Sequence, residues 1–188
     1  GGESTLPESE RGMKINAPRT PGIGMFSDDI RDAVKGHVFY MDELGFVNGA
    51  ADRGEELKQA VTCAKWAKSP MQSINYLSCH DNYTLWDRFI ISNSHESEEM
   101  RIRMNKLAAA ILFTAQGIPF FLHGEEFART KISEADGAPV ENSYCSPLSV
   151  NAIDYDRAEQ FSDLKAYYKG LIALRRAHKS FYLDTVDE

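Results

Sequence analysis

The sequence predicts an α/β fold in which parallel strands alternate with helices. Three short apolar segments, 22–26, 73–79 and 118–123, have the composition of strands, and helical patterns occupy the stretches that follow them. Strands joined through helices run in the same direction, because the helix carries the chain back to the starting edge of the sheet. The order strand, helix, strand, helix, strand, helix therefore predicts a parallel sheet with right-handed crossovers.

The first half of the chain contains three predicted helices. A short helix over 8–17 ends at prolines that precede the first strand. Ser27 is a candidate N-cap for a helix that reaches Lys35, with two acidic residues in its first turn. A further helix is predicted over 55–68, and the strand 73–79 follows it.

The second half begins with the most strongly patterned helix, which Ser97 caps and Gly117 ends. The strand 118–123 is flanked by glycines and is predicted to be buried on both faces. A long loop, 124–154, then leads to a final helix over 163–178. The apolar stripes of these two helices comprise Met100, Met104, Leu107, Ala108, Ile111 and Leu112 in one, and Leu164, Tyr167, Leu171 and Leu174 in the other.

The composition of the 188 residues excludes several classes of partner. The net charge is −7, so the clustered basic side chains that bind nucleic acid or an anionic membrane surface are absent. No apolar run approaches the roughly 20 residues that span a bilayer. The first residues carry no basic-then-apolar signal pattern. The three cysteines are odd in number and widely spaced, which indicates buried free thiols and neither a disulfide framework nor a Cys-x-x-Cys site.

Polar side chains follow each predicted strand, and the ends of parallel strands meet at one edge of a sheet. These side chains can therefore converge on one site. For the first loop a helix cap is the simpler interpretation, and for the third a solvated pair or an ion pair with Arg129 or Lys131 is as plausible as ligand binding. For the loop after the second strand, the alternative to ligand binding is a capping aspartate beside a core histidine. The residues are Ser27, Asp28 and Asp29, then His80, Asp81 and Asn82, then His123, Glu125, Glu126 and Arg129.

Other chemistries have weaker support. His80, Asp81, His123 and Glu125 are conceivable metal ligands, but no pair has a diagnostic spacing such as His-Glu-x-x-His, so we predict no metal site and no cofactor. A Cys79–His80 dyad is disfavoured if both residues lie in the strand, because neighbours in a strand point to opposite faces. A Ser-His-Asp triad lacks the Gly-x-Ser-x-Gly elbow.

Residues 73–87, with His80-Asp81-Asn82 at their centre, resemble the fourth conserved region of the α-amylase superfamily, in the form it has in type I pullulanases. Residues 116–127 resemble the segment around the eighth barrel strand. The resemblance extends to the sixth strand and its helix, to the loop after the eighth strand and to the last barrel helix: Gly22 to Asp28 with Arg31 and Asp32, then Asn142 to Asp154, then Leu171 to His178.

This resemblance implies a partial (β/α)8 TIM barrel comprising about strands six to eight with their helices. Residues 1–178 would be the C-terminal portion of the catalytic barrel, and 179–188 the start of a following β domain. The implied activity is retaining hydrolysis of α-1,6-glucosidic bonds in pullulan, starch or limit dextrins. The implied partner is therefore an α-glucan oligosaccharide or polysaccharide.

The resemblance also implies roles for individual residues. Asp81 is expected to stabilise the distorted, oxocarbenium-like sugar through its hydroxyls, and His80 to donate to a neighbouring hydroxyl. Asn82 is expected to line the leaving-group side of the substrate. Three residues of the long loop are expected on the glycone side: Arg129, Asn142 and Tyr144.

The same resemblance places the nucleophile and the acid/base upstream of Gly1, since no Gly-Phe-Arg-Phe-Asp-like or Tyr-Gly-Glu-like segment occurs here. We therefore expect the isolated chain to be inactive, because a retaining glycosidase needs two carboxylates that straddle the bond. A partial barrel exposes sheet edges, so we also expect self-association. The alternatives are an isoamylase-like or α-1,4-amylase specificity, or a non-catalytic carbohydrate-binding module built on Trp66, Trp86 or Tyr144.

Overall fold

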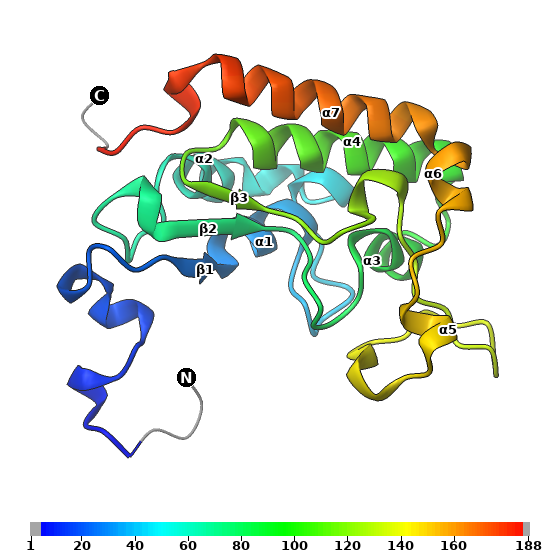
Figure 1. The fold of residues 1–188 in the computed structure, drawn as a ribbon, viewed down its shortest axis with the longest axis horizontal. Helices are drawn as coiled ribbons and strands as arrows, with labels where there is room; N and C mark the ends of the chain where they lie inside the picture. The colour runs from blue at the N-terminus through cyan, green and yellow to red at the C-terminus, as the bar shows by residue number, and fades with distance from the viewer. Residues whose placement is uncertain (1–4, 186–188) are drawn as a thin grey trace.

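A three-stranded parallel sheet lies at the centre of the computed structural model, which describes residues 5–185 (Figure 1). The middle strand pairs with both neighbours in parallel, so the predicted parallel α/β sheet is confirmed. The strands are shorter than predicted, because the chain leaves the sheet soon after the paired residues. In order across the sheet they are β1 (Met25–Ser27), β2 (Ser73–Tyr76) and β3 (Ile118–Phe120).

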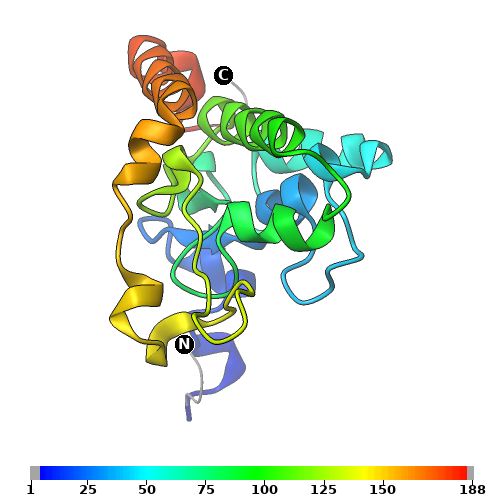
Figure 2. The same cartoon turned by 90° about the vertical axis from the view of Figure 1, so that its right-hand side faces the viewer.

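Helices cover one side of this sheet (Figures 1 and 2). The two longest, α4 and α7, pack along each other, while α1 and α2 pair beside them. In chain order the helices are α1 (Asp28–Lys35), α2 (Gly54–Thr62), α3 (Leu85–Ser92), α4 (Glu98–Thr114), α5 (Leu148–Asn151), α6 (Asp156–Gln160) and α7 (Ser162–Ala177). None of the helices within residues 5–185 is long and apolar enough to cross a membrane.

The core lies between the sheet and these helices. In α4 the predicted stripe is right for Met104, Ala108 and Leu112, which are buried. In α7 the inward face is Leu164, Tyr168, Leu171 and Arg175, at helical spacing. The predicted members Met100, Leu107, Tyr167 and Leu174 are 37–44% exposed, so these assignments were wrong.

Several predicted elements need correction. The helix predicted over 8–17 is two 3-10 helices, Glu8–Glu10 and Lys14–Arg19, separated at Gly12. The helix predicted over 55–68 ends at Thr62, because Cys63 is extended. Helix α3 was not predicted at all. Helices α1, α4 and α7 agree with the sequence to within a few residues.

The sheet face opposite the helices is open, which contradicts the prediction that β3 is buried on both faces. Phe26, Ile118 and Phe120 are 41%, 39% and 38% exposed. Phe26 packs edge-on against Phe120, with 5.2 Å between ring centroids, so this face is a partly exposed aromatic surface.

The end of the chain after α7 forms a 3-10 helix, Lys179–Phe181, in the part that the structure describes. Residues 186–188 lie outside the described residues. The assignment of 179–188 to a β domain therefore stays a prediction, as does the numbering of the strands as six to eight.

Candidate functional site

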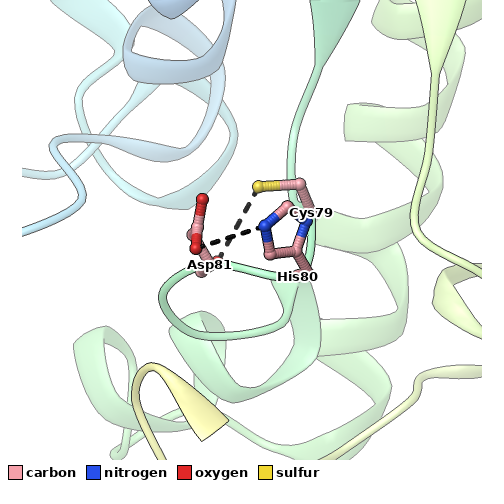
Figure 3. Close-up of side chains that lie close together, drawn as sticks. All are labelled: Cys79, His80 and Asp81. Atoms are coloured by element: carbon pink, nitrogen blue, oxygen red, sulfur yellow. Dashed lines mark hydrogen bonds and ion pairs between the residues drawn. The ribbon is translucent and has the colours of Figure 1, made fainter. Parts of the chain in front are cut away.

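The loop after β2 presents the two predicted catalytic side chains at the C-terminal end of the sheet (Figure 3). The strand ends at Tyr76, so Cys79, His80 and Asp81 all lie in the loop and not in the strand. The side chains of His80 and Asp81 are 83% and 63% exposed, and His80 Nε2 lies 3.4 Å from Asp81 Oδ1. The strand condition under which Cys79 and His80 would point to opposite faces is therefore not met, since a loop does not impose strand alternation.

The adjacent loop is tied to this one by two predicted substrate-binding residues. The backbone N–H of Asn82 donates to Asn142 Oδ1 at 2.8 Å. Both asparagines have positive φ, 57° and 48°, a conformation that asparagine tolerates better than most residues. The structure thus brings Asn82 and Asn142 together, although they are 60 positions apart.

A buried carboxyl group fixes the start of the His80 loop. Glu125 is 3% exposed, accepts a hydrogen bond from Ser78 Oγ and lies 3.3 Å from the Tyr168 hydroxyl. Burial raises the pKa of Glu125 to about 7, against the lowering effects of the Ser78 hydrogen bond and the charge of Lys35. The solvated pair and the ion pair with Arg129 or Lys131 are both wrong for Glu125, because its side chain is buried and contacts Ser78 and Tyr168 instead.

The ammonium group of Lys35 is the cation that opposes Glu125. Lys35 is 2% exposed at the end of α1. Burial lowers its pKa to about 8, and the neighbouring charge of Arg31 lowers it further, while Glu125 acts in the opposite direction. Glu125 and Lys35 are therefore two buried titratable groups whose charges act on each other.

Asp28, after β1, is engaged by cations of the chain itself. Its carboxylate forms ion pairs with Lys14 and Arg31 and accepts a hydrogen bond from the Tyr76 hydroxyl at 3.0 Å. Burial favours a higher pKa for Asp28, but the Lys14 hydrogen bond and then the charge of Arg31 outweigh it, so the pKa is lowered. Ser27 occupies the N-cap position as predicted, but its side chain makes no capping hydrogen bond.

Asp87 was missed by sequence reasoning and anchors the long loop. This fully buried carboxylate in α3 accepts hydrogen bonds from Thr130 Oγ1 and from the Lys131 N–H, the latter at 2.9 Å. Lys131 Nζ in turn donates to Ser143 Oγ at 2.7 Å. The available signal was Thr84, whose side chain caps α3 by accepting from the Asp87 N–H at 3.1 Å.

The remaining predicted residues occupy different surroundings. The guanidinium of Arg129 donates to the carbonyls of His123 and Asn151 at 3.0 and 2.7 Å, so it links two parts of its own loop. Burial lowers the pKa of Arg129, and the charge of Asp87 opposes that shift. The Tyr144 side chain is open to solvent, with 86% exposure. His123 is exposed and lies beside the Tyr155 ring.

The exposed part of the site consists of a hydrogen-bond donor and a carboxylate acceptor on one loop. An imidazole and a carboxylate side by side can bind two neighbouring hydroxyl groups of a ligand. Four other carboxyl groups that follow the strands have partners within the chain, whereas Asp29 after β1 is exposed. The four are Asp28, Asp87, Glu125 and Glu126, the last of which accepts from the Gly124 N–H.

No family model matches the chain. Among curated proteins, the pullulanase of Bacillus subtilis strain 168 is 40% identical over 185 residues, which cover 95% of this chain and 25% of that protein. The chloroplastic pullulanase 1 of Arabidopsis thaliana is 30% identical, over 78% of this chain and 20% of that protein. The chain thus spans about a quarter of the length of these relatives.

Solved structures give the same result. The pullulanase of Paenibacillus barengoltzii, in complex with maltohexaose and α-cyclodextrin, matches with a TM-score of 0.89 and 44% identity, over 98% of this chain and 29% of that one. The pullulanase of Anoxybacillus sp. LM18-11, complexed with maltotriose, matches with a TM-score of 0.92 and 41% identity, over 98% and 26%. At these identities the similarity includes the sequence as well as the fold.

Proposed function

We propose that this chain, which is related to a quarter-length segment of pullulanases, carries part of the catalytic site of an α-glucan debranching hydrolase. The observation that carries the proposal is the exposed pair His80 and Asp81 at the C-terminal end of a parallel sheet, where such folds place their chemistry. The sheet would be strands six to eight of a (β/α)8 barrel. The bond cleaved would be the α-1,6 link.

Asp81 acts on the sugar at the cleavage point in this proposal. Its carboxylate accepts hydrogen bonds from two ring hydroxyls, and these bonds strengthen as the ring flattens toward an oxocarbenium ion. His80 Nε2 lies 3.4 Å from the same carboxylate and donates to an adjacent hydroxyl. Asn82 and Asn142, joined to each other, fix the wall between the two loops, and Tyr144 offers an exposed ring on which a sugar can stack.

Hydrolysis would require carboxylates from outside this chain. A retaining mechanism needs a nucleophile and an acid/base about 5 Å apart across the bond. The carboxylates of Asp28, Asp87 and Glu125, which follow the three strands in the sequence, are each held by side chains of this chain. Asp81 alone can stabilise charge but cannot complete the reaction.

The experiment for this proposal measures reducing sugar released from pullulan by the purified chain. We expect no turnover above the buffer blank, because the two reacting carboxylates are supplied by other parts of the enzyme. Turnover by the chain that disappears in Asp81→Ala would contradict the inactivity of the chain. In a complete enzyme that carries this chain, hydrolysis of amylose, whose links are α-1,4, would favour the α-1,4-amylase alternative, and cleavage of the α-1,6 branches of amylopectin without cleavage of pullulan would favour the isoamylase-like one.

A carbohydrate-binding module is the alternative from another class, and the positions of its proposed aromatic residues count against it. Trp86 is 4% exposed in the core, and the Trp66 ring is partly buried with Lys14 Nζ 5.9 Å from its centroid. Only Tyr144 of the three is widely exposed. Titration with maltotriose distinguishes the two functions. Binding that survives Asp81→Ala but is lost in Tyr144→Ala would favour the module.

A further inference from the structure

Three consecutive side chains of the loop after β2 turn toward one another (Figure 3). The Cys79 thiol, the His80 imidazole and the Asp81 carboxylate each offer one ligand atom, and these atoms all lie within 4.8 Å of one another. Two of the three side chains are widely exposed, so an ion from solution can reach them. Grouping of a sulfur, a nitrogen and an oxygen donor on one short loop is a metal-ligand set.

The separations fit a tetrahedral ion. Nitrogen and oxygen ligands that lie about 2.0–2.1 Å from a tetrahedral zinc ion are about 3.3 Å apart. The observed distance between His80 Nε2 and Asp81 Oδ1 is 3.4 Å. A thiolate at about 2.3 Å would lie about 3.6 Å from each of the other two ligands, so Cys79 Sγ needs to approach by about 1 Å at most. Rotation of the Cys79 side chain, whose thiol makes one long hydrogen bond to the Asp81 carbonyl at 4.0 Å, can provide that shift.

The donor types select a class of metal. Thiolate and imidazole ligands favour zinc and similar thiophilic divalent ions, whereas calcium and magnesium require oxygen ligands. Three protein ligands leave a fourth position open to water or to a hydroxyl of a ligand. Cys79 and Asp81 supply two negative charges when bound, and the ammonium of Lys131, a cation whose pKa responds to both, is already held by Ser143.

The loop is anchored on both sides of this ligand set. Ser78 Oγ donates to the buried Glu125, and the Asn82 N–H donates to Asn142. The backbone that carries the three ligands is therefore held at its two ends. Preorganised ligands reduce the entropy that is lost on binding.

We propose that Cys79, His80 and Asp81 form a binding site for a thiophilic divalent cation of the zinc class, and that this cation excludes the glucan. The bound ion would occupy His80 Nε2 and the Asp81 carboxylate, the same atoms that are assigned to the sugar hydroxyls. The cation is thus an inhibitor and not a cofactor. Its competition with glucan rests on the proposed function, whereas its binding does not.

Cobalt and zinc titrations of the full chain test the site. We expect one equivalent of Co²⁺ to produce a thiolate-to-cobalt charge-transfer band in the near ultraviolet, and Zn²⁺ to displace it. Cys79→Ser should abolish the band and weaken Zn²⁺ binding at least tenfold. His80→Ala and Asp81→Asn should also weaken Zn²⁺ binding at least tenfold. Circular dichroism of each variant checks the fold.

The other two cysteines provide matched controls, because Cys145 is an exposed free thiol and Cys63 a half-buried one. Cys145→Ser and Cys63→Ser should leave the cobalt band and the zinc affinity unchanged. A band that persists in Cys79→Ser, or that disappears in Cys145→Ser, would overturn the assignment. So would zinc affinity that is unaffected by all three ligand substitutions.

A parallel maltotriose titration separates this inference from the proposed function. If both hold, zinc lowers the apparent maltotriose affinity in the parent chain but not in Cys79→Ser. If zinc binds through Cys79 but maltotriose binding does not depend on Asp81, the metal site is supported and its competition with glucan is overturned. Maltotriose binding that requires Asp81, with no zinc bound, would overturn the metal site alone.

Discussion

The hydrogen bonds of Glu125 connect the core to the loop that carries His80 and Asp81. Its two carboxyl oxygens face Ser78 and Tyr168, and the Tyr168 hydroxyl also lies 2.8 Å from Asn105 Oδ1. Ser78 stands two residues before His80, so this buried group helps to set where the loop leaves the sheet. Because a buried carboxylate is costly, the protonated form is favoured here and the pKa of Glu125 rises to about 7.

The titration of Glu125 makes stability depend on pH. The native state holds this proton more tightly than the unfolded state, in which the pKa is 4.5. The contribution is fully present below the unfolded pKa and is lost as the pH rises through about 7. We expect the free energy of unfolding to fall between pH 5 and pH 7.5 by up to about 2.5 kcal/mol more in the parent chain than in Glu125→Gln.

Urea unfolding at both pH values measures this difference. Gln keeps the shape and an acceptor for Ser78 but does not ionise, so Glu125→Gln is the matched variant. Parallel pH dependence in the two proteins would show that the Glu125 proton is not linked to folding.

The sequence predicted the position of the exposed loop residues better than the surroundings of the buried ones. His80, Asp81 and Asn82 follow a strand in a recognisable order, and the structure places them in a loop at the sheet end. The environment of Glu125 could not be predicted, because its partners stand 47 and 43 positions away and meet it only through tertiary packing. The same applies to Lys35, whose burial at the end of α1 has no local signal.

At the scale of elements, α3 is the support of the long loop. Its buried Asp87 accepts hydrogen bonds from the Thr130 hydroxyl and from the Lys131 backbone N–H. Arg88, on the same helix and also buried, donates to the carbonyls of Tyr40 and Glu43 at 3.2 and 3.0 Å. One eight-residue helix thus holds two loops that carry little regular structure of their own.

We expect Asp87→Ala to release the segment 124–154. The Lys131 N–H and the Thr130 hydroxyl would lose their acceptor, and unsatisfied buried donors cost about 2–3 kcal/mol. Hydrogen exchange at the Lys131 amide should accelerate markedly while amides of α4 stay protected. Unchanged exchange at Lys131 would contradict the role of Asp87 as the anchor.

The length of a helix and its capping residue affected whether the sequence predicted it. Helix α4 was predicted because it is 17 residues long and begins with a capping serine, whose side chain accepts a hydrogen bond from the Met100 N–H at 3.1 Å. Helix α3 was missed because eight residues provide little periodicity, although Thr84 gives a capping signal. The 3-10 helices near the N-terminus depend on tertiary contacts, such as the hydrogen bond from Gln72 Nε2 to the Ala17 carbonyl at 2.9 Å.

At the scale of the whole molecule, the open sheet face is the main departure from a closed fold. Strands β1 and β3 are the two edges of the described sheet, and Phe26 and Phe120 lie partly exposed across it. In a complete barrel this face would point inward. An uncovered apolar face and two unpaired edges favour association between copies.

We therefore predict that the chain associates with itself at micromolar concentration. Sedimentation velocity should show a mass that rises with concentration. The double variant Phe26→Lys and Phe120→Lys should shift the equilibrium toward the monomer, whereas Tyr167→Lys, on an exposed position of α7, should not. A clean monomer at every concentration would contradict this prediction.

The most direct test of the central claim places the chain in a complete enzyme. The matching quarter of the Bacillus subtilis pullulanase would be replaced by this chain, and hydrolysis of pullulan would be measured. We expect the chimera to release reducing sugar, and we expect Asp81→Ala to reduce its kcat by at least about 100-fold, as loss of a transition-state contact does. A folded chimera in which Asp81→Ala leaves pullulan hydrolysis intact would contradict the assignment of Asp81 to the catalytic site.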